Sequence, residues 1–182
     1  IFSSSCFSIR RPSQELKFGY SVLKEPANNL GILYNISRLA VNCKKTSTKE
    51  AEDMWITSKF NNLVKTATEE LEKLRPHLAT RAIQNFWLND FSRKYIQIVR
   101  ERLSSDDSSA QSTVNEIYLN LIKLAAPTIP FLTESIWQNL RQNKIVKEES
   151  VHLCDWPKFD EKKINSKLES EFEIAFEIIE KG

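Results

Sequence analysis

The spacing of the apolar residues constrains the fold of this chain more than any other feature. From residue 20 to residue 140 hydrophobic side chains recur every three or four positions, and the 182 residues include only 3 glycines and 6 prolines. This period buries one stripe of a helix, whereas a sheet would need strict alternation and more turn-forming residues. A chain of this length also buries enough surface to form a core. We therefore expect an all-α fold, a bundle of about five to six helices.

Prolines and polar runs set the boundaries of the expected helices. Pro26 lies early in the first helix, so it either kinks this helix or marks its true start. The second and third helices are joined by a short connection at Pro76, and they should therefore pack antiparallel. Pro127 and Pro130 fix a corner between the fourth helix and a shorter one. The expected segments are 20–43, 49–74, 78–103, a helix after the capped loop 104–112, one around 132–140, and 161–182.

The second expected helix has two different faces. Ile56 and Phe60 belong to an apolar stripe that should pack in the core. Another side carries residues that recur at helical spacing: Trp55, Lys59, Asn62, Thr66 and Glu69. We expect this second side to face solvent.

The composition divides the chain into three parts. We interpret residues 1–19 as a linker, 20–148 as the helical bundle, and 149–182 as an ordered extended loop followed by the start of a C-terminal helical extension. Residues 1–14 are rich in serine, contain two arginines and lack acids, as organellar transit peptides do. Because the chain begins with Ile rather than Met, we favour an internal cut through a longer protein. The residues of the last helix that are spaced for burial are Ile164, Leu168, Phe172, Ile174, Ala175 and Ile178.

The charge and the cysteines exclude several classes of site. A formal net charge of +2 is too small for the whole chain to attract a polyanion, so any nucleic-acid site must be local. The three cysteines lie far apart and form no CxxC pair, which disfavours a disulfide framework and a zinc site and fits a reducing cytosol. The two histidines are isolated, and we expect no metal. No apolar run approaches the roughly 20 residues that span a bilayer, so we expect no membrane association.

The sequence also lacks the motifs of catalysis. It has no glycine-rich phosphate-binding loop, no nucleophile and base pair, and no metal cluster. This points to a binding function for these residues.

The best candidate surface is the second half of the third helix. Arg93, Gln97 and Arg100 follow one another at helical spacing, and Tyr95 and Arg102 lie seven residues apart on a neighbouring line. Guanidinium groups suit phosphate, and an aromatic ring can stack on an unpaired base. The alternative is structural: Arg93 and Arg100 would pair with Asp90 and with carboxylates of a neighbouring helix. The same alternative applies to Arg102, and Tyr95 would be buried.

Trp156 likewise has an RNA-binding and a structural interpretation. It lies before Pro157, which pushes it toward extended geometry. Its ring either packs against the bundle or contacts RNA, and the sequence leaves both open.

Four motifs in a fixed order carry a resemblance to a known family. They resemble the anticodon-binding domain of class I aminoacyl-tRNA synthetases, and of the isoleucine enzymes in particular. Leu16-Lys17-Phe18 is similar to the segment that follows the catalytic domain in that family. The four motifs are Asp53-Met54-Trp55-Ile56-Thr57-Ser58-Lys59-Phe60-Asn61, Asp90-Phe91-Ser92-Arg93-Lys94-Tyr95, Leu124-Ala125-Ala126-Pro127-Thr128-Ile129-Pro130-Phe131-Leu132-Thr133-Glu134, and Ser150-Val151-His152-Leu153-Cys154-Asp155-Trp156-Pro157.

The resemblance implies a binding role within an ATP-dependent isoleucine-tRNA ligase. The bundle would hold the anticodon stem-loop of tRNA-Ile, while the catalytic and editing domains, with ATP and Mg, would lie elsewhere in the parent chain. It also implies a cytoplasmic monomer that contacts its own catalytic domain. The residues that we predict to bind tRNA are Arg93, Lys94, Tyr95, Arg100, Arg102 and Trp156.

Two features depart from the family pattern, and two rival functions remain. Lys94 stands where tryptophan is commoner, and Pro26 is unusual in the first helix. The valine enzyme shares the fold, but Ser92-Arg93 and His152-Leu153 favour the isoleucine enzyme. A helical interaction scaffold without an RNA role would bind partners independently of salt and have no affinity for tRNA.

Overall fold

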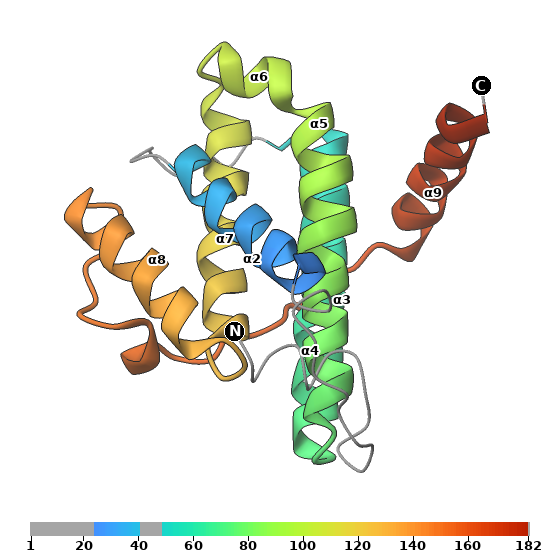
Figure 1. The fold of residues 1–182 in the computed structure, drawn as a ribbon. Helices are drawn as coiled ribbons and strands as arrows, with labels where there is room; N and C mark the ends of the chain where they lie inside the picture. Colours follow the sequence, from blue (N-terminus) through green and yellow to red (C-terminus); the bar gives the residue numbers. More distant parts are fainter. Residues whose placement is uncertain (1–23, 41–48, 182) are drawn as a thin grey trace.

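The computed structural model describes residues 24–40 and 49–181. Every regular element in these ranges is helical, which confirms the expected all-α fold (Figure 1). The predicted linker 1–19 and the ends of the first expected helix lie outside the described residues.

Helix α2 spans Lys24–Ile36 and continues into a 3-10 turn, η2, at Ser37–Leu39. Pro26 lies in the first turn of α2, where a missing N–H costs no helical hydrogen bond, so the structure agrees with a start rather than a kink. Leu33 packs in the core, and its carbonyl accepts a hydrogen bond of 2.8 Å from the Tyr118 hydroxyl of α7. This bond fixes α2 across the bundle.

Helix α3 (Ala51–Glu72) and helix α4 (Pro76–Asn85) form the antiparallel pair that the short connection predicts. A capping box starts α3: the Glu50 side chain accepts from the N3 backbone, and Asp53 accepts from the Glu50 backbone. Leu74 ends the pair in a left-handed conformation with φ 55°. The Arg75 N–H then bonds back to the Glu70 carbonyl at 2.8 Å, as in a Schellman motif.

The third expected helix contains a π-helical stretch. Helix α4 passes without interruption into η3, a π-helix at Phe86–Tyr95, and then into α5 (Ile96–Ile98). The rings of Phe86, Phe91 and Tyr95 stack along it with centroids 6.1 and 6.0 Å apart and planes within 11°. Their spacing of five and four residues suits the wider π turn. The helical lines predicted with an ordinary period are therefore shifted over these ten residues.

Helices α6, α7 and α8 follow and complete the bundle. After the short helix α6 (Arg100–Ser104), helix α7 (Ser108–Ala125) begins at a cap from Asp107, whose carboxylate accepts from the Ser109 N–H at 2.8 Å. The expected loop 104–112 is thus shorter than predicted, because the cap is Asp107 rather than a residue at the loop's end. Helix α8 (Pro130–Gln142) starts with its proline in the first turn, as the corner at Pro127 and Pro130 predicts.

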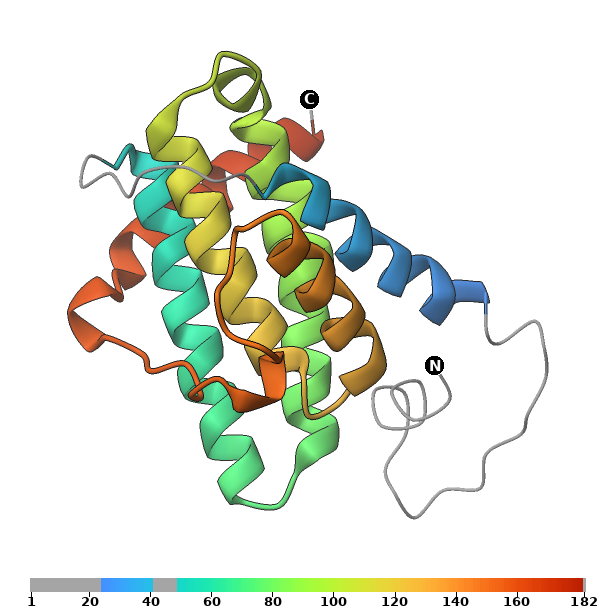
Figure 2. The same ribbon diagram turned by 90° about the vertical axis from the view of Figure 1, so that its left-hand side faces the viewer.

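The chain after α8 returns to α3 through an ordered irregular segment (Figure 2). It contains two 3-10 turns, η4 (Val151–Leu153) and η5 (Glu161–Lys163), and ends in helix α9 (Ser166–Lys181). Side chains of α3 hold this segment by hydrogen bonds at intervals. These bonds are Trp156 Nε1 to Thr68 Oγ1 at 2.9 Å, Asp160 N to Asn61 Oδ1 at 2.7 Å, Asn165 N to Ser58 Oγ at 2.8 Å, and Asn62 Nδ2 to Glu169 Oε1 at 2.7 Å.

Helix α9 covers part of the side of α3 that the sequence assigns to solvent. The prediction was wrong for Trp55, Lys59 and Asn62, whereas Thr66 and Glu69 are exposed as expected. Trp55 is fully buried because Phe172 stacks on it at 5.2 Å and Phe176 packs beside it at 5.3 Å. Lys59 pairs with Glu173 of α9 at 2.7 Å. A periodic pattern marks a face as polar, but it cannot show that a segment a hundred residues later binds that face.

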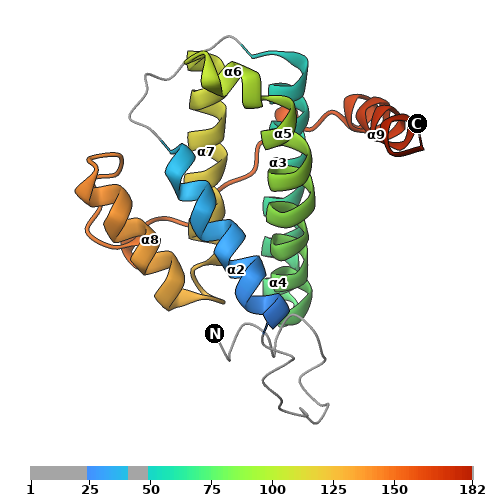
Figure 3. The same cartoon turned by 45° about the horizontal axis from the view of Figure 1, so that its top comes forward.

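The burial predicted for α9 itself was only partly right. Phe172 and Leu168 are half-buried against α3, whereas Ile174 and Ile178 are 61% and 67% exposed. The apolar residues that α9 packs against the core are Leu168, Phe172 and Phe176. The helix lies on the side of the bundle opposite α8 (Figure 3).

Candidate nucleic-acid interface

The six residues that the sequence assigns to tRNA binding occupy three different environments. Arg102 and Tyr95 lie inside a hydrogen-bond network, Trp156 packs on α3, and the remaining three line or flank an open face of the third helix.

Arg102 is held by three carboxylates. Its Nη1 contacts Glu52 at 2.6 Å, its Nη2 contacts Asp53 at 2.9 Å, and its Nε contacts Asp107 at 2.7 Å. Burial alone would lower the pKa of Arg102, but the hydrogen bonds to Asp53, Asp107 and Glu52 outweigh it and raise that pKa. The Arg102 hydrogen bond in turn lowers the pKa of Asp107. All three nitrogens of the guanidinium are engaged within the protein, so its position does not support a phosphate contact.

Tyr95 belongs to the same network. Its ring is 0% exposed, and its hydroxyl donates to Asp53 at 2.5 Å. Burial, together with the hydrogen bond to Asp53, raises the pKa of Tyr95. No surface of this ring is open to a base, so stacking of Tyr95 on RNA is not supported either.

The buried carboxylate of Asp53 is the centre of this cluster, which we call the Asp53 corner. Its oxygens accept from Tyr95, from Arg102, from Ser109 at 3.2 Å and from the Glu50 N–H at 3.1 Å. These donors come from the start of α3, the end of η3, α6 and α7. A buried charge needs such a set of donors. The corner therefore explains why an aspartate, a tyrosine and an arginine stand at these three places.

The sequence left two roles open for Trp156, packing against the bundle or contact with RNA, and in the structure Trp156 packs against the bundle. Its indole is half-buried, and its Nε1 donates to Thr68 of α3. The bond anchors the segment between α8 and α9, and contact of Trp156 with RNA stays an untested prediction.

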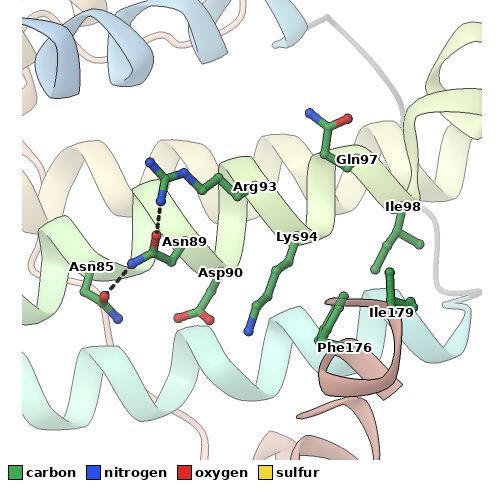
Figure 4. Close-up of a pocket in the computed structure, with 9 residues that line it drawn as sticks. All are labelled: Asn85, Asn89, Asp90, Arg93, Lys94, Gln97, Ile98, Phe176 and Ile179. Atoms are coloured by element: carbon green, nitrogen blue, oxygen red, sulfur yellow. Dashed lines mark hydrogen bonds between the residues drawn. The ribbon is translucent and has the colours of Figure 1, made fainter. Parts of the chain in front are cut away.

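The open face of the third helix carries a row of polar side chains (Figure 4). Arg93 donates to Asn89 Oδ1 at 3.0 Å, and Asn89 Nδ2 donates to Asn85 Oδ1 at 2.7 Å. The row lies beside a groove of about 750 Å³ between η3 and α9. The sequence reasoning missed Asn85 and Asn89, although their spacing of four residues from each other and from Arg93 places them on one line.

Lys94 points to the opposite wall of this groove. Its Nζ lies 4.7 Å from the centre of the Phe176 ring, a cation–π contact with α9. Burial raises the pKa of the adjacent Asp90, and the charges of Lys59 and Lys94 offset this only in part. The hydrogen bond from Lys59 lowers the pKa of Glu173. Lys94 thus helps to hold α9, and its head group still lines the groove.

Arg100 is exposed at the start of α6, beyond the groove. Within residues 24–40 and 49–181 its side chain has neither an ion pair nor a hydrogen bond. Arg93 and Arg100 therefore present guanidinium donors to solvent. Arg93 is held by its hydrogen bond to Asn89, and Arg100 has no side-chain partner among the described residues. This is the chemistry that recognises phosphate groups.

Among the described residues no group of three or more His, Cys, Asp or Glu side chains could hold a metal ion. None of the helices described is long and apolar enough to cross a membrane.

Comparison with known proteins identifies the family. The family model of the anticodon-binding domain of tRNA ligase matches residues 53–181. The chain belongs to this family. The anticodon-binding domain begins its match at Asp53, the centre of the buried corner.

Curated relatives of this anticodon-binding domain are tRNA ligases. The chain is 37% identical over 188 residues to the isoleucine–tRNA ligase of Thermococcus kodakarensis, covering 94% of this chain and 18% of the relative. The enzyme of Methanosarcina mazei is 33% identical over 189 residues, with 93% and 18% covered. The valine–tRNA ligase of Thermococcus kodakarensis is 38% identical over 134 residues, with 71% and 15% covered. The chain thus spans about a fifth of the length of these relatives.

A solved structure supports the fold of the anticodon-binding domain. The ternary complex of Agrobacterium radiobacter LeuRS, tRNA and LeuAMS contains a chain that matches 90% of this one with a TM-score of 0.61, at 15% sequence identity and over 20% of its own length. At this identity the likeness establishes the fold alone.

Proposed function

We propose that this chain binds the anticodon arm of tRNA-Ile and positions it as part of an isoleucine-tRNA ligase. The observation that carries the proposal is the open face of the third helix, where Arg93 and Arg100 offer guanidinium groups on a domain of the anticodon-binding family. Phosphate contacts of this kind set the register of an RNA, while unpaired bases supply the sequence information.

Isoleucine is preferred to valine because of how far the similarity extends. The isoleucine–tRNA ligase and the valine–tRNA ligase of the same organism are 37% and 38% identical to this chain. The isoleucine enzyme matches 94% of the chain, and the valine enzyme matches 71%. The additional matched length supports the isoleucine assignment.

In this proposal the ligase reaction is carried out by the whole parent protein, of which this chain is the tRNA-binding part. ATP and Mg, which activation of isoleucine requires, would be bound outside residues 24–181, and the bundle would contact the catalytic domain. We place the protein in the cytoplasm as a monomer. The division into a linker at 1–19, a bundle at 20–148 and a C-terminal extension at 149–182 is part of the same proposal.

Binding of tRNA by the purified 182-residue chain tests the proposal. Fluorescence anisotropy with labelled tRNA-Ile and tRNA-Val transcripts, from 50 to about 300 mM KCl, should give tighter binding of tRNA-Ile and an affinity that falls as salt rises. Equal and salt-independent binding of both, or no binding at low salt, would favour the interaction scaffold. Isoleucine-dependent pyrophosphate exchange should be absent from the same sample, and its presence would contradict the assignment of a binding role alone.

A further inference from the structure

A second recess lies between the C-terminal ends of α2 and α8, away from the groove of Figure 4. It has a volume of about 470 Å³, a size typical of small-ligand sites. Its apolar lining residues are the buried Leu140 and Ala40 and the half-buried Ile145. Tyr34 and Arg38, which are both exposed, line its solvent side.

The groups on the solvent side are suited to one planar, polar ligand. Tyr34 is 36% exposed on α2, so part of its side chain is open to solvent. The Arg38 guanidinium is exposed one helical turn further on, without an ion pair or hydrogen bond in the described part of the chain. An aromatic ring and a guanidinium plane are the two surfaces on which unpaired bases stack in protein–RNA complexes.

Two asparagines of α8 supply hydrogen-bonding groups on the opposite wall. Asn143 donates its amide to the backbone oxygen and to the Oδ1 of Asn139, both at 2.9 Å. This arrangement leaves the Asn139 amide nitrogen as a donor and the Asn143 Oδ1 as an acceptor, neither with a partner among the described side chains. A donor and an acceptor side by side match the edge of a nucleobase.

We propose that this recess binds one unpaired nucleotide of the tRNA, with its base on Tyr34, its edge toward Asn139 and Asn143, and its phosphate at Arg38. The inference rests on the proposed function, and it adds a site on the far side of α2 from the Arg93 row. Phosphate contacts on the third helix then fix the orientation of the RNA, and the recess holds an unstacked base.

Substitutions at the recess test the inference by tRNA-Ile binding to the purified chain. Tyr34→Ala should weaken binding about tenfold, the loss expected for one stacked base, while Tyr34→Phe should stay within about twofold of the unchanged chain. Arg38→Gln should weaken binding by about fivefold and lower the salt slope by about one. Circular dichroism melting of each variant checks that it is folded.

Matched controls separate stacking from general attraction. Phe131→Ala removes an aromatic ring that is 87% exposed on α8, and Arg141→Gln removes an exposed arginine of the same helix, both outside the recess. Both should stay within about twofold of the unchanged chain. If Arg141→Gln weakens binding as much as Arg38→Gln, the attraction is diffuse and the recess is not a site.

A crosslinking experiment on the unsubstituted chain guards against variants that fail to fold. Photoactivated tRNA-Ile carrying 4-thiouridine should crosslink to peptides containing Tyr34 or Asn139 through a nucleotide outside the stems. Binding of tRNA-Ile with normal salt dependence, but with no crosslink there and no effect of Tyr34→Ala, would overturn the recess and leave the proposed function standing. Absence of tRNA binding by the unsubstituted chain would overturn both.

Discussion

The Asp53 corner and the open face of the third helix use basic residues in opposite ways. In the corner, Arg102 is 21% exposed and contacts three carboxylates. On the open face, Arg100 stands two residues earlier in the chain and is exposed without a partner in the ranges described. Among the described residues, the Arg93 side chain bonds to the neutral amide of Asn89 and to no carboxylate.

This difference shows that position in the fold, and not residue type, decides what an arginine does here. A guanidinium whose nitrogens are all paired with buried or half-buried carboxylates stabilises the junction of α3, η3, α6 and α7. A guanidinium that faces water costs little to leave unpaired and is available to an anionic partner. Substitutions on the two sides should therefore separate stability from binding.

The largest loss of stability is expected at Trp55, on the side of α3 that α9 covers. Trp55→Ala should lower the free energy of unfolding by about 3–5 kcal/mol, because it removes the ring on which Phe172 stacks. Chemical denaturation gives this value, and hydrogen exchange should show that α9 loses protection. Met54→Ala, at a half-exposed neighbouring position, should cost less than about 1 kcal/mol. Similar losses for the two variants would mean that α9 does not depend on Trp55.

A smaller loss is expected in the Asp53 corner. Asp53→Asn should lower the free energy of unfolding by about 3 kcal/mol, since the buried carboxylate is the shared acceptor for Tyr95 and Arg102. Glu101→Gln, an exposed acid of α6, is the control and should change it by less than about 0.5 kcal/mol. A loss below about 1 kcal/mol for Asp53→Asn would contradict the role of the corner.

The contact between Lys59 and Glu173 should have a small effect that depends on pH. The folded-state pKa of Glu173 lies below its ordinary value of 4.5. The ion pair therefore stabilises fully above that value, and its contribution is lost as pH falls through the lowered pKa. Glu173 is 55% exposed, so Glu173→Gln should cost less than about 0.5 kcal/mol at pH 7.

Melting temperatures of the chain and of Glu173→Gln at pH 7 and pH 3 test this. The two should differ slightly at pH 7, and the difference should shrink as the pH falls through the lowered pKa of Glu173. A difference that does not change with pH would show that this ion pair does not hold α9.

Much of the fold could be predicted because helical periodicity and prolines are local signals. The α3 and α4 pair, the start of α8 at Pro130 and the half-buried Phe172 all follow from spacing and proline geometry. The π-helix could not be derived from an ordinary helical period. The five-residue spacing of Phe86 and Phe91, followed by four residues to Tyr95, is the one local signal that fits it.

The candidate site was less predictable because it depends on contacts between distant segments. Asp53 lies 42 positions before Tyr95 and 49 positions before Arg102, so these residues meet only in the folded chain. The third-helix pattern placed Arg102 among the tRNA-binding residues, since nothing local shows that three carboxylates surround it. Trp55 was assigned to solvent because its cover, α9, begins more than a hundred residues later.

The smallest effects on stability, and the most direct test of the central claim, are expected on the open face. Arg93→Ala with Arg100→Ala should leave the melting temperature of the chain within about 2 °C and lower the salt slope of tRNA-Ile binding by about two, one for each lost phosphate contact. Arg102→Ala should do the reverse, lowering the melting temperature by roughly 5 °C while the salt slope stays the same. The account is contradicted if Arg102→Ala reduces the salt slope without loss of stability, or if the double variant binds tRNA-Ile with an unchanged slope.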